Sequence, residues 1–145
     1  MSTAAGTRAL GVDLGERRIG LALSDPSRTV ASPHDVLRRS GDRDADRRAI
    51  VGAARAAGAG VIVVGLPLSL SGKVGPAARA ALDEVEALRA VATGIEVVVH
   101  DERLTTVTAE RALVEGGVRR DDRRKVVDKV AAAIMLQSWL EGSGS

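Results

Sequence analysis

The amino-acid sequence predicts an α/β fold in which helices cover both faces of a mixed five-stranded sheet. Two features predict it: short apolar strands that form a hairpin come first, and strands and helices alternate after them. A hairpin supplies antiparallel strands, whereas strands separated by helices pair in parallel, so the sheet is mixed. The 145 residues suit one domain, which we expect over 1–145, with flexible tails at about 1–7 and 142–145.

The first three strands are expected at residues 8–14, 18–24 and 30–36. The first is an apolar run that ends in an acid and a glycine, as suits a central strand. Only a few residues separate it from the second run, so the two form a β-hairpin. Pro33 has no N–H group to donate, which favours an edge position for the third strand.

The remaining elements alternate between helix and strand. A row of alanines at spacings of four predicts the next helix, which Gly58 ends. A continuous β-branched run follows, typical of a strand buried on both faces, and Pro76 opens the helix after it. The run 118–125 is so highly charged that we expect an exposed loop. The expected ranges are a helix at 42–57, a strand at 61–64, a helix at 76–91, a strand at 95–100, and helices at 105–116 and 126–140.

The composition excludes several classes of protein. The absence of cysteine excludes a disulfide framework, a thiolate metal site and a cysteine nucleophile. Trp139 is the single aromatic residue, which argues against proteins that stack bases on aromatic side chains. Arginine dominates the basic residues and suits phosphate binding, although codon bias explains the same excess. Because we find no secretory signal and no membrane-spanning run, we expect a soluble, cytoplasmic monomer or homodimer that does not bind membranes.

Three acids fall where α/β sheets place their chemistry. Asp13 ends the first strand and Glu102 follows the last, so both emerge at the carboxyl edge of the sheet, where ligands bind. Asp128 lies in the first turn of the last helix, on the same face as Ala132 and Met135. That face is small and apolar, so we expect it to lie against the sheet and to carry Asp128 inward.

Converging carboxylates repel one another unless a cation or a proton lies between them. With acids as ligands, the fitting cation is Mg²⁺ or Mn²⁺, and two such ions about 3.5–4 Å apart can activate water and stabilise the leaving oxygen of a phosphodiester. Each acid also has a purely structural interpretation: Asp13 as a turn former, Asp101 or Glu102 as a helix cap or first-turn acid, and Asp128 as a first-turn acid. The three together favour the metal site.

Two segments near that edge suit phosphate. The loop 65–73 offers backbone N–H groups, hydroxyls and Lys73, although a plain connecting loop is the alternative. Arg17 and Arg18 in the hairpin turn are placed to contact a nucleic-acid backbone. We expect His100, which precedes the acids, to be a hydrogen-bonded polar residue rather than a metal ligand.

Four segments together resemble one known family, and they span most of the chain in the order GVDLGERRIGLALSDP, VVGLPLSLSGKVG, HDERLTTVTAERAL and KVVDKVAAAIMLQSWL. They are similar to the YqgF/RuvX family of RNase H-like nucleases, described as Holliday junction resolvases and as nucleases that mature the 5′ end of pre-16S ribosomal RNA. The resemblance implies an RNase H-like fold with sheet order 3-2-1-4-5. It implies that Asp13, Glu102 and Asp128 are the catalytic, metal-binding acids. It also leads us to expect nucleic-acid contacts from Arg103, Thr105 and Thr106.

We therefore expect a hydrolase, a divalent-metal-dependent endonuclease that acts on pre-16S rRNA, on Holliday junctions, or on both. Two other classes stay open: an ATP-binding phosphotransferase-like domain on the same core, and a nucleic-acid-binding module without catalysis. The former needs two such domains to close over a nucleotide, and this chain supplies one. The latter would keep buried carboxylates at a cost in stability.

Overall fold

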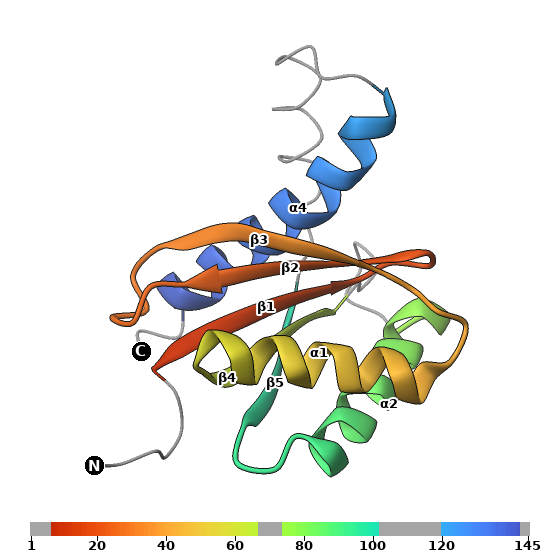
Figure 1. Cartoon of the computed structure of the whole chain (residues 1–145), viewed down its shortest axis with the longest axis horizontal. Coiled ribbons are helices and arrows are strands. Elements are labelled where there is room, and N and C mark those ends of the chain that lie inside the picture. The colour runs from red at the N-terminus through yellow and green to blue at the C-terminus, as the bar shows by residue number, and fades with distance from the viewer. Residues whose placement is uncertain (1–6, 67–73, 102–119, 143–145) are drawn as a thin grey trace.

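The computed structural model describes residues 7–66, 74–101 and 120–142, and for 120–128 the backbone alone. These residues form five strands and three helices (Figure 1). In chain order they are β1 (Arg8–Leu14), β2 (Arg18–Ser24), β3 (Ala31–Arg38), α1 (Arg43–Ala57), β4 (Ala59–Leu66), α2 (Pro76–Val91), β5 (Glu96–Asp101) and α4 (Arg120–Gly142).

The five strands form one sheet in the order β3-β2-β1-β4-β5. β2 is antiparallel to both β1 and β3, whereas β1, β4 and β5 run parallel. The mixed pairing and the strand order confirm the fold class predicted from the sequence. The edge position of β3 is confirmed as well, and Pro33 lies there beside an irregularity in the pairing with β2.

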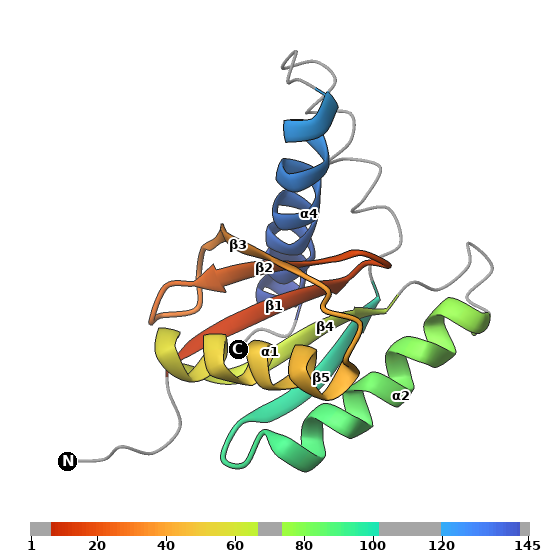
Figure 2. The ribbon, with the colours of Figure 1, turned by 45° about the vertical axis from the view of Figure 1, so that its right-hand side comes forward.

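Helices cover both faces of the sheet. α1 and α2 lie on one face and α4 crosses the other, as Figures 1 and 2 show. Side chains of β1 alternate between the two layers: Leu10 and Val12 pack with α1 and α2, whereas Ala9 packs with α4. β4 repeats the pattern, since Ile62 belongs to the first cluster and Val63 to the second.

A glycine lets α4 approach the centre of the sheet. A Cβ atom at Gly11 of β1 would stand 2.9 Å from Leu136 Cβ and 3.2 Å from the carbonyl oxygen of Ala132. Any larger residue would therefore push α4 away from β1, because packed interiors leave no room for an added methyl group. Gly11 thus fixes where α4 crosses β1, two residues before Asp13.

α1 has the boundaries that its sequence predicts. Asp42 is its N-cap, and the carboxylate accepts hydrogen bonds from the backbone N–H groups of Asp44 and Ala45. Gly58 ends the helix with φ at 74°, in the left-handed region that glycine adopts without strain. These local signals lie within a few residues of the helix, which is why the sequence alone reveals them.

α4 is longer than the sequence predicts. It begins at Arg120, so residues 120–125 are helical rather than an exposed loop, and it ends at Gly142 rather than Leu140. Arginine and lysine favour helices, and a helix needs no apolar face where it extends beyond the sheet, as the N-terminal turns of α4 do (Figure 1). The helix expected at 105–116 lies outside the described residues. No helix in the described part of the chain has the length and apolarity that crossing a bilayer requires.

Candidate functional site

Asp13 lies near the carboxyl end of β1, on the face that α4 covers. Ala9 packs with α4 and Gly11 contacts it, so Asp13, two residues further on, has the same orientation. Its neighbour across the antiparallel pair is Gly20 of β2, which has no side chain to fill the adjacent space. Asp13 is half-buried. A carboxylate therefore stands where β1 leaves the sheet beside α4.

β5 ends at the same edge of the sheet. β1, β4 and β5 are parallel, and their register aligns Val12 with Val64 and Val64 with Val99. Only β4 separates β1 from β5, so the axes of these two strands lie about 10 Å apart. Glu102 directly follows β5, which ends at Asp101. Glu102 itself lies outside the described residues.

His100 is hydrogen-bonded, as expected from the sequence. Its Nε2 lies 2.9 Å from Oγ of Ser138 on α4. Burial lowers the pKa of His100, and the nearby charge of Asp101 opposes that shift only in part. Val98, two residues earlier, packs in the cluster under α4. α4 is thus in contact with both strands whose ends carry predicted acids.

α4 crosses the sheet in a direction that brings its early turns toward Asp13. Oε1 of Gln137 accepts a hydrogen bond of 2.8 Å from the backbone N–H of Ala31, at the start of β3. Ala31 pairs with Ser24, whose Oγ accepts a hydrogen bond of 2.8 Å from the N–H of Ala9. The C-terminal half of α4 therefore lies at the amino end of β1. Its N-terminal turns run toward the carboxyl end of that strand (Figure 1).

The apolar face predicted for α4 is buried against the sheet, since Ala132 and Met135 are both fully buried in its cluster. Asp128 lies one turn before Ala132, with its side chain outside the described residues. Among the residues whose side chains are described, no three acidic or histidine residues are grouped so that they could hold a metal ion. Of the three predicted acids, only Asp13 has a described side chain. The structure thus places α4 in contact with β1, which carries Asp13, and with β5, which Glu102 follows.

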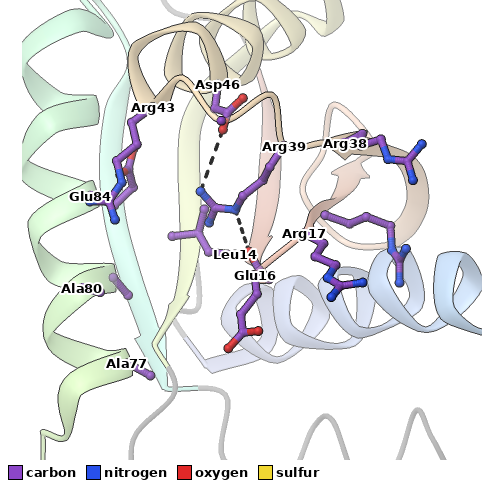
Figure 3. Close-up of a pocket in the computed structure, with 14 residues that line it drawn as sticks. Leu14, Glu16, Arg17, Arg38, Arg39, Arg43, Asp46, Ala77, Ala80 and Glu84 are labelled. Carbon is purple, nitrogen blue, oxygen red and sulfur yellow. Dashed lines mark hydrogen bonds and ion pairs between the residues drawn. The ribbon is translucent and has the colours of Figure 1, made fainter.

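Arg17 and Arg18 line an open pocket of about 890 Å³ beyond the end of β1 (Figure 3). Sequence analysis missed three further arginines there, Arg38, Arg39 and Arg43. β3 runs two residues past its predicted end, and this extension places Arg38 directly opposite Arg18. Continuing the strand pattern through Arg38 would have revealed the pair. The other predicted nucleic-acid contacts, Lys73, Arg103, Thr105 and Thr106, lie outside the described residues.

Arg39 holds the β1–β2 turn against α1. Its Nε donates a 2.6 Å hydrogen bond to the carbonyl of Gly15, and its backbone N–H donates one of 2.9 Å to the carbonyl of Arg17. The guanidinium also lies 4.0 Å from the carboxylate of Asp46 on α1 (Figure 3). Burial raises the pKa of Asp46, but hydrogen bonds donated by the N–H and hydroxyl of Ser40, with the charge of Arg39, outweigh it and lower that pKa.

Comparison with known proteins identifies the family. The model described as "RuvX: Holliday junction resolvase" matches residues 7–142. The chain belongs to the RuvX family. It is similar to proteins named "Putative pre-16S rRNA nuclease": 46% identical to one from Kineococcus radiotolerans over 91% of this chain and 70% of that protein, and 42% identical to one from Pelotomaculum thermopropionicum over 94% and 88%. A relative of the same name from Mycobacterium sp. (strain KMS) is 42% identical over 92% and 79%.

Among solved structures, the RuvX-family chain is similar in fold to RuvC of T. thermophilus in complex with a Holliday junction substrate. The TM-score is 0.58 at 14% sequence identity, over 95% of this chain and 96% of RuvC. Free Thermus thermophilus RuvC gives a TM-score of 0.55 at the same identity, over 94% and 96%. The RuvC likeness confirms the RNase H-like fold, and the family with its nuclease relatives confirms the expected nuclease class.

Proposed function

We propose that this RuvX-family chain is an endonuclease that uses divalent metal ions to hydrolyse phosphodiester bonds in structured nucleic acid. The observation that carries the proposal is the place of Asp13: half-buried, at the carboxyl edge of the sheet, on the face where α4 contacts Gly11. Ligands of open α/β sheets bind at this edge. Glu102, which follows β5, and Asp128, which lies in α4, would complete the acidic triad.

The donor set fits Mg²⁺ or Mn²⁺. Both cations prefer carboxylate oxygens, the chain has no cysteine, and His100 is engaged with Ser138. Asp13, Glu102 and Asp128 are therefore the residues proposed to hold the ions, of which we propose two. When bound, such ions activate water and stabilise the charge that develops on the leaving oxygen.

Basic and hydroxyl side chains near the acids would position the substrate. Arg17 stands in the turn just beyond the acids, where its planar guanidinium can donate two parallel hydrogen bonds to one backbone phosphate. Arg39 keeps that turn at a fixed place relative to α1. We propose that the phosphates along the strand are also bound by Arg18, Lys73, Arg103, Thr105 and Thr106.

The proposed physiological substrate is a precursor of 16S rRNA, cleaved at its 5′ end in the cytoplasm. Relatives that are 42–46% identical over most of the chain carry the name of that activity. A four-way DNA junction is the second candidate, because the matching family model is described by that substrate. The choice between RNA and DNA depends on contacts to the 2′-hydroxyl group.

One experiment compares these substrates directly. The purified chain is incubated with Mn²⁺ or Mg²⁺ and with labelled precursor RNA, four-way DNA junction and linear duplex, side by side. Cleavage of the precursor near the mature 5′ end, abolished by EDTA, is the expected result. Symmetrical cleavage of the junction alone would make the chain a resolvase. Binding without any cleavage would favour the non-catalytic module, and hydrolysis of ATP would favour the phosphotransferase-like alternative.

A further inference from the structure

The pocket beyond the β1–β2 turn carries positive charge that its own acids do not neutralise. Its charged lining residues are Arg17, Arg18, Arg38, Arg39, Arg43, Glu16, Asp46 and Glu84. Two of the three acids are already engaged. Asp46 interacts with Ser40 and Arg39. Glu84 accepts hydrogen bonds of 2.6 and 3.2 Å from Arg47 of α1, which is not among the lining residues. Glu16 is the one acid left to offset the other arginines.

Three arginines of this pocket have guanidinium groups available to a ligand. In the described part of the chain, the side chains of Arg17, Arg38 and Arg43 make no hydrogen bond or ion pair. They come from three different elements, the β1–β2 turn, the end of β3 and the first turn of α1, and so form an open frame, with Arg43 beside α2 and Arg38 at the opposite end (Figure 3). A polyanion is the ligand that such a frame attracts.

The strand pairing adds to this positive field. Arg18 and Arg38 stand directly opposite each other on β2 and β3. Like charges in this position destabilise a sheet.

The position of the pocket relates it to the predicted acids. Leu14 lines the pocket and packs with the α1 and α2 cluster, whereas its neighbour Asp13 faces α4. The α2 wall of the pocket and the acidic edge therefore lie on the two sides of the β1–β2 turn. Arg18 and Arg38, which alternate with the core residues Ile19 and Leu37, lie on the same side as Asp13. About 890 Å³ is much more than one phosphate group occupies, and Ala77 and Ala80 of α2 form a small, neutral far wall (Figure 3). The space suits an extended polymer rather than a single anion.

We propose that this pocket binds the sugar–phosphate backbone of the substrate outside the cleaved bond, so that the strand passes from the acids over the β1–β2 turn, with Arg38 on the acidic side of the turn and Arg43 on the other. This proposal rests on the nuclease function proposed above. Phosphate is the target because arginine binds it through two hydrogen bonds. Bases are not, because the only aromatic residue, Trp139, packs with the cluster under α4. The substrate is thus a nucleic acid that extends well past its cleavage site.

The test uses two double variants of the full chain. Arg38→Gln/Arg43→Gln removes two charges from the pocket and keeps most of the side-chain volume. Arg48→Gln/Arg79→Gln is the matched control, because these arginines are exposed on α1 and α2, lie outside the pocket lining, and have no ion pair within the described residues. Far-ultraviolet circular dichroism and the unfolding temperature check that both variants fold as the unmodified chain does.

Binding is measured by fluorescence anisotropy in EDTA, so that metal-dependent cleavage does not occur. The probes are a precursor RNA hairpin and a DNA four-way junction. Each is prepared with a single-stranded extension on the 5′ or the 3′ side of the expected cleavage site, and without any extension. Comparing the RNA and DNA probes shows which nucleic acid the pocket prefers. Comparing probes with and without an extension distinguishes binding at the pocket from binding at the acidic edge.

We expect the pocket variant to bind an extended probe at least about tenfold more weakly than the unmodified chain at about 0.1 M salt. The slope of log affinity against log salt concentration should be lower by about two units, and the affinity of the control variant should stay within about twofold of the unmodified chain. Probes without an extension should bind the unmodified chain, the pocket variant and the control variant with the same affinity. Unchanged affinity of the pocket variant, or equal losses in both variants, would overturn the proposal. Displacement of the probe by micromolar ATP from the unmodified chain alone would make it a nucleotide pocket and overturn it too. Failure of the proposed function would be recognised separately, as absence of cleavage with bound substrate and metal.

Discussion

The two faces of β1 differ in their chemistry. Leu10 and Val12 face α1 and α2 and are fully buried among aliphatic side chains. Ala9, Gly11 and Asp13 face α4, so that face is small along most of the strand and acidic where the strand ends. A single strand thus supplies apolar volume to one side and a closely packed helix with a carboxylate to the other.

The difference suggests a division of labour between the faces. Burying one Leu or Val side chain stabilises the fold by about 1.5–3 kcal/mol, whereas glycine and alanine contribute little of this kind. The α1 and α2 face therefore provides stability. The α4 face provides a close approach, which positions α4 relative to Asp13. Substitutions on the two faces should separate the loss of stability from the loss of activity.

The largest effect on activity is expected from Asp13→Asn. The amide retains the size of the side chain but removes a charge that the metal ions require, so cleavage should fall by more than about 100-fold while the fold is preserved. Single-turnover cleavage assays and thermal unfolding measure the two quantities. Asp83→Asn, an exposed acid of α2, is the control and should cleave normally. Near-normal cleavage by Asp13→Asn would remove this residue from the site.

Leu10→Ala tests the opposite face. The substitution leaves a cavity among the side chains under α1 and α2, and we expect the free energy of unfolding to fall by about 2–5 kcal/mol. Cleavage per folded molecule should stay near that of the unmodified chain, because the α4 contact is untouched. Urea unfolding combined with cleavage assays at low temperature tests this. A loss of activity without a loss of stability would contradict the division between the faces.

Gly11→Ala should affect both quantities at once. The added methyl group would stand 2.9 Å from Leu136 Cβ and 3.2 Å from the Ala132 carbonyl, so α4 must shift, at a cost of about 1–3 kcal/mol. Because α4 also carries Asp128, cleavage per folded molecule should fall as well. Gly52→Ala is the control: a Cβ atom there meets nothing within 4 Å. If Gly11→Ala lost stability alone, the position of α4 would not matter to the site.

The parts of the fold that local pattern determines were predictable. β1 and β2 have the predicted bounds because a hairpin joins neighbours in sequence, and α1 has its cap and its terminating glycine within its own segment. The start of α4 was not predictable in this way. A charged run has the same composition in an exposed loop as in a helix that extends beyond the sheet, so residues 120–125 were assigned wrongly.

The candidate site likewise has residues that local sequence pattern predicts and residues that it does not. The edge position of Asp13 follows from strand alternation and parallel topology, both of which the sequence indicates. Extending the predicted third strand by two residues would have placed Arg38 opposite Arg18. Arg43 could not be found from local pattern, because it joins the pocket through the placement of α1. The convergence of Glu102 and Asp128 on Asp13 stays a prediction.

The smallest expected effect concerns the α1 side of the site. Hydrogen bonds from Ser40 and the charge of Arg39 lower the pKa of Asp46 in the folded chain despite the opposing effect of burial. A lowered carboxyl pKa adds stability above about pH 4, the unfolded value, and this stability is lost as the pH falls toward the folded value. Asp46→Asn should therefore be less stable than the unmodified chain by about 1 kcal/mol at pH 7, and the difference should shrink as the pH falls below about 4.

Urea unfolding of both proteins between neutral pH and acid measures this difference, with Asp83→Asn as the control for removing one negative charge. A difference that stayed constant with pH would mean that Asp46 acts through packing rather than through its charge. The same variant also tests the division between the faces. Asp46 is linked through Arg39 to the carbonyl of Gly15 in the β1–β2 turn. If its loss weakens substrate binding while leaving the cleavage rate of bound substrate unchanged, the α1 side positions the phosphate-binding turn without taking part in the chemistry at the α4 face.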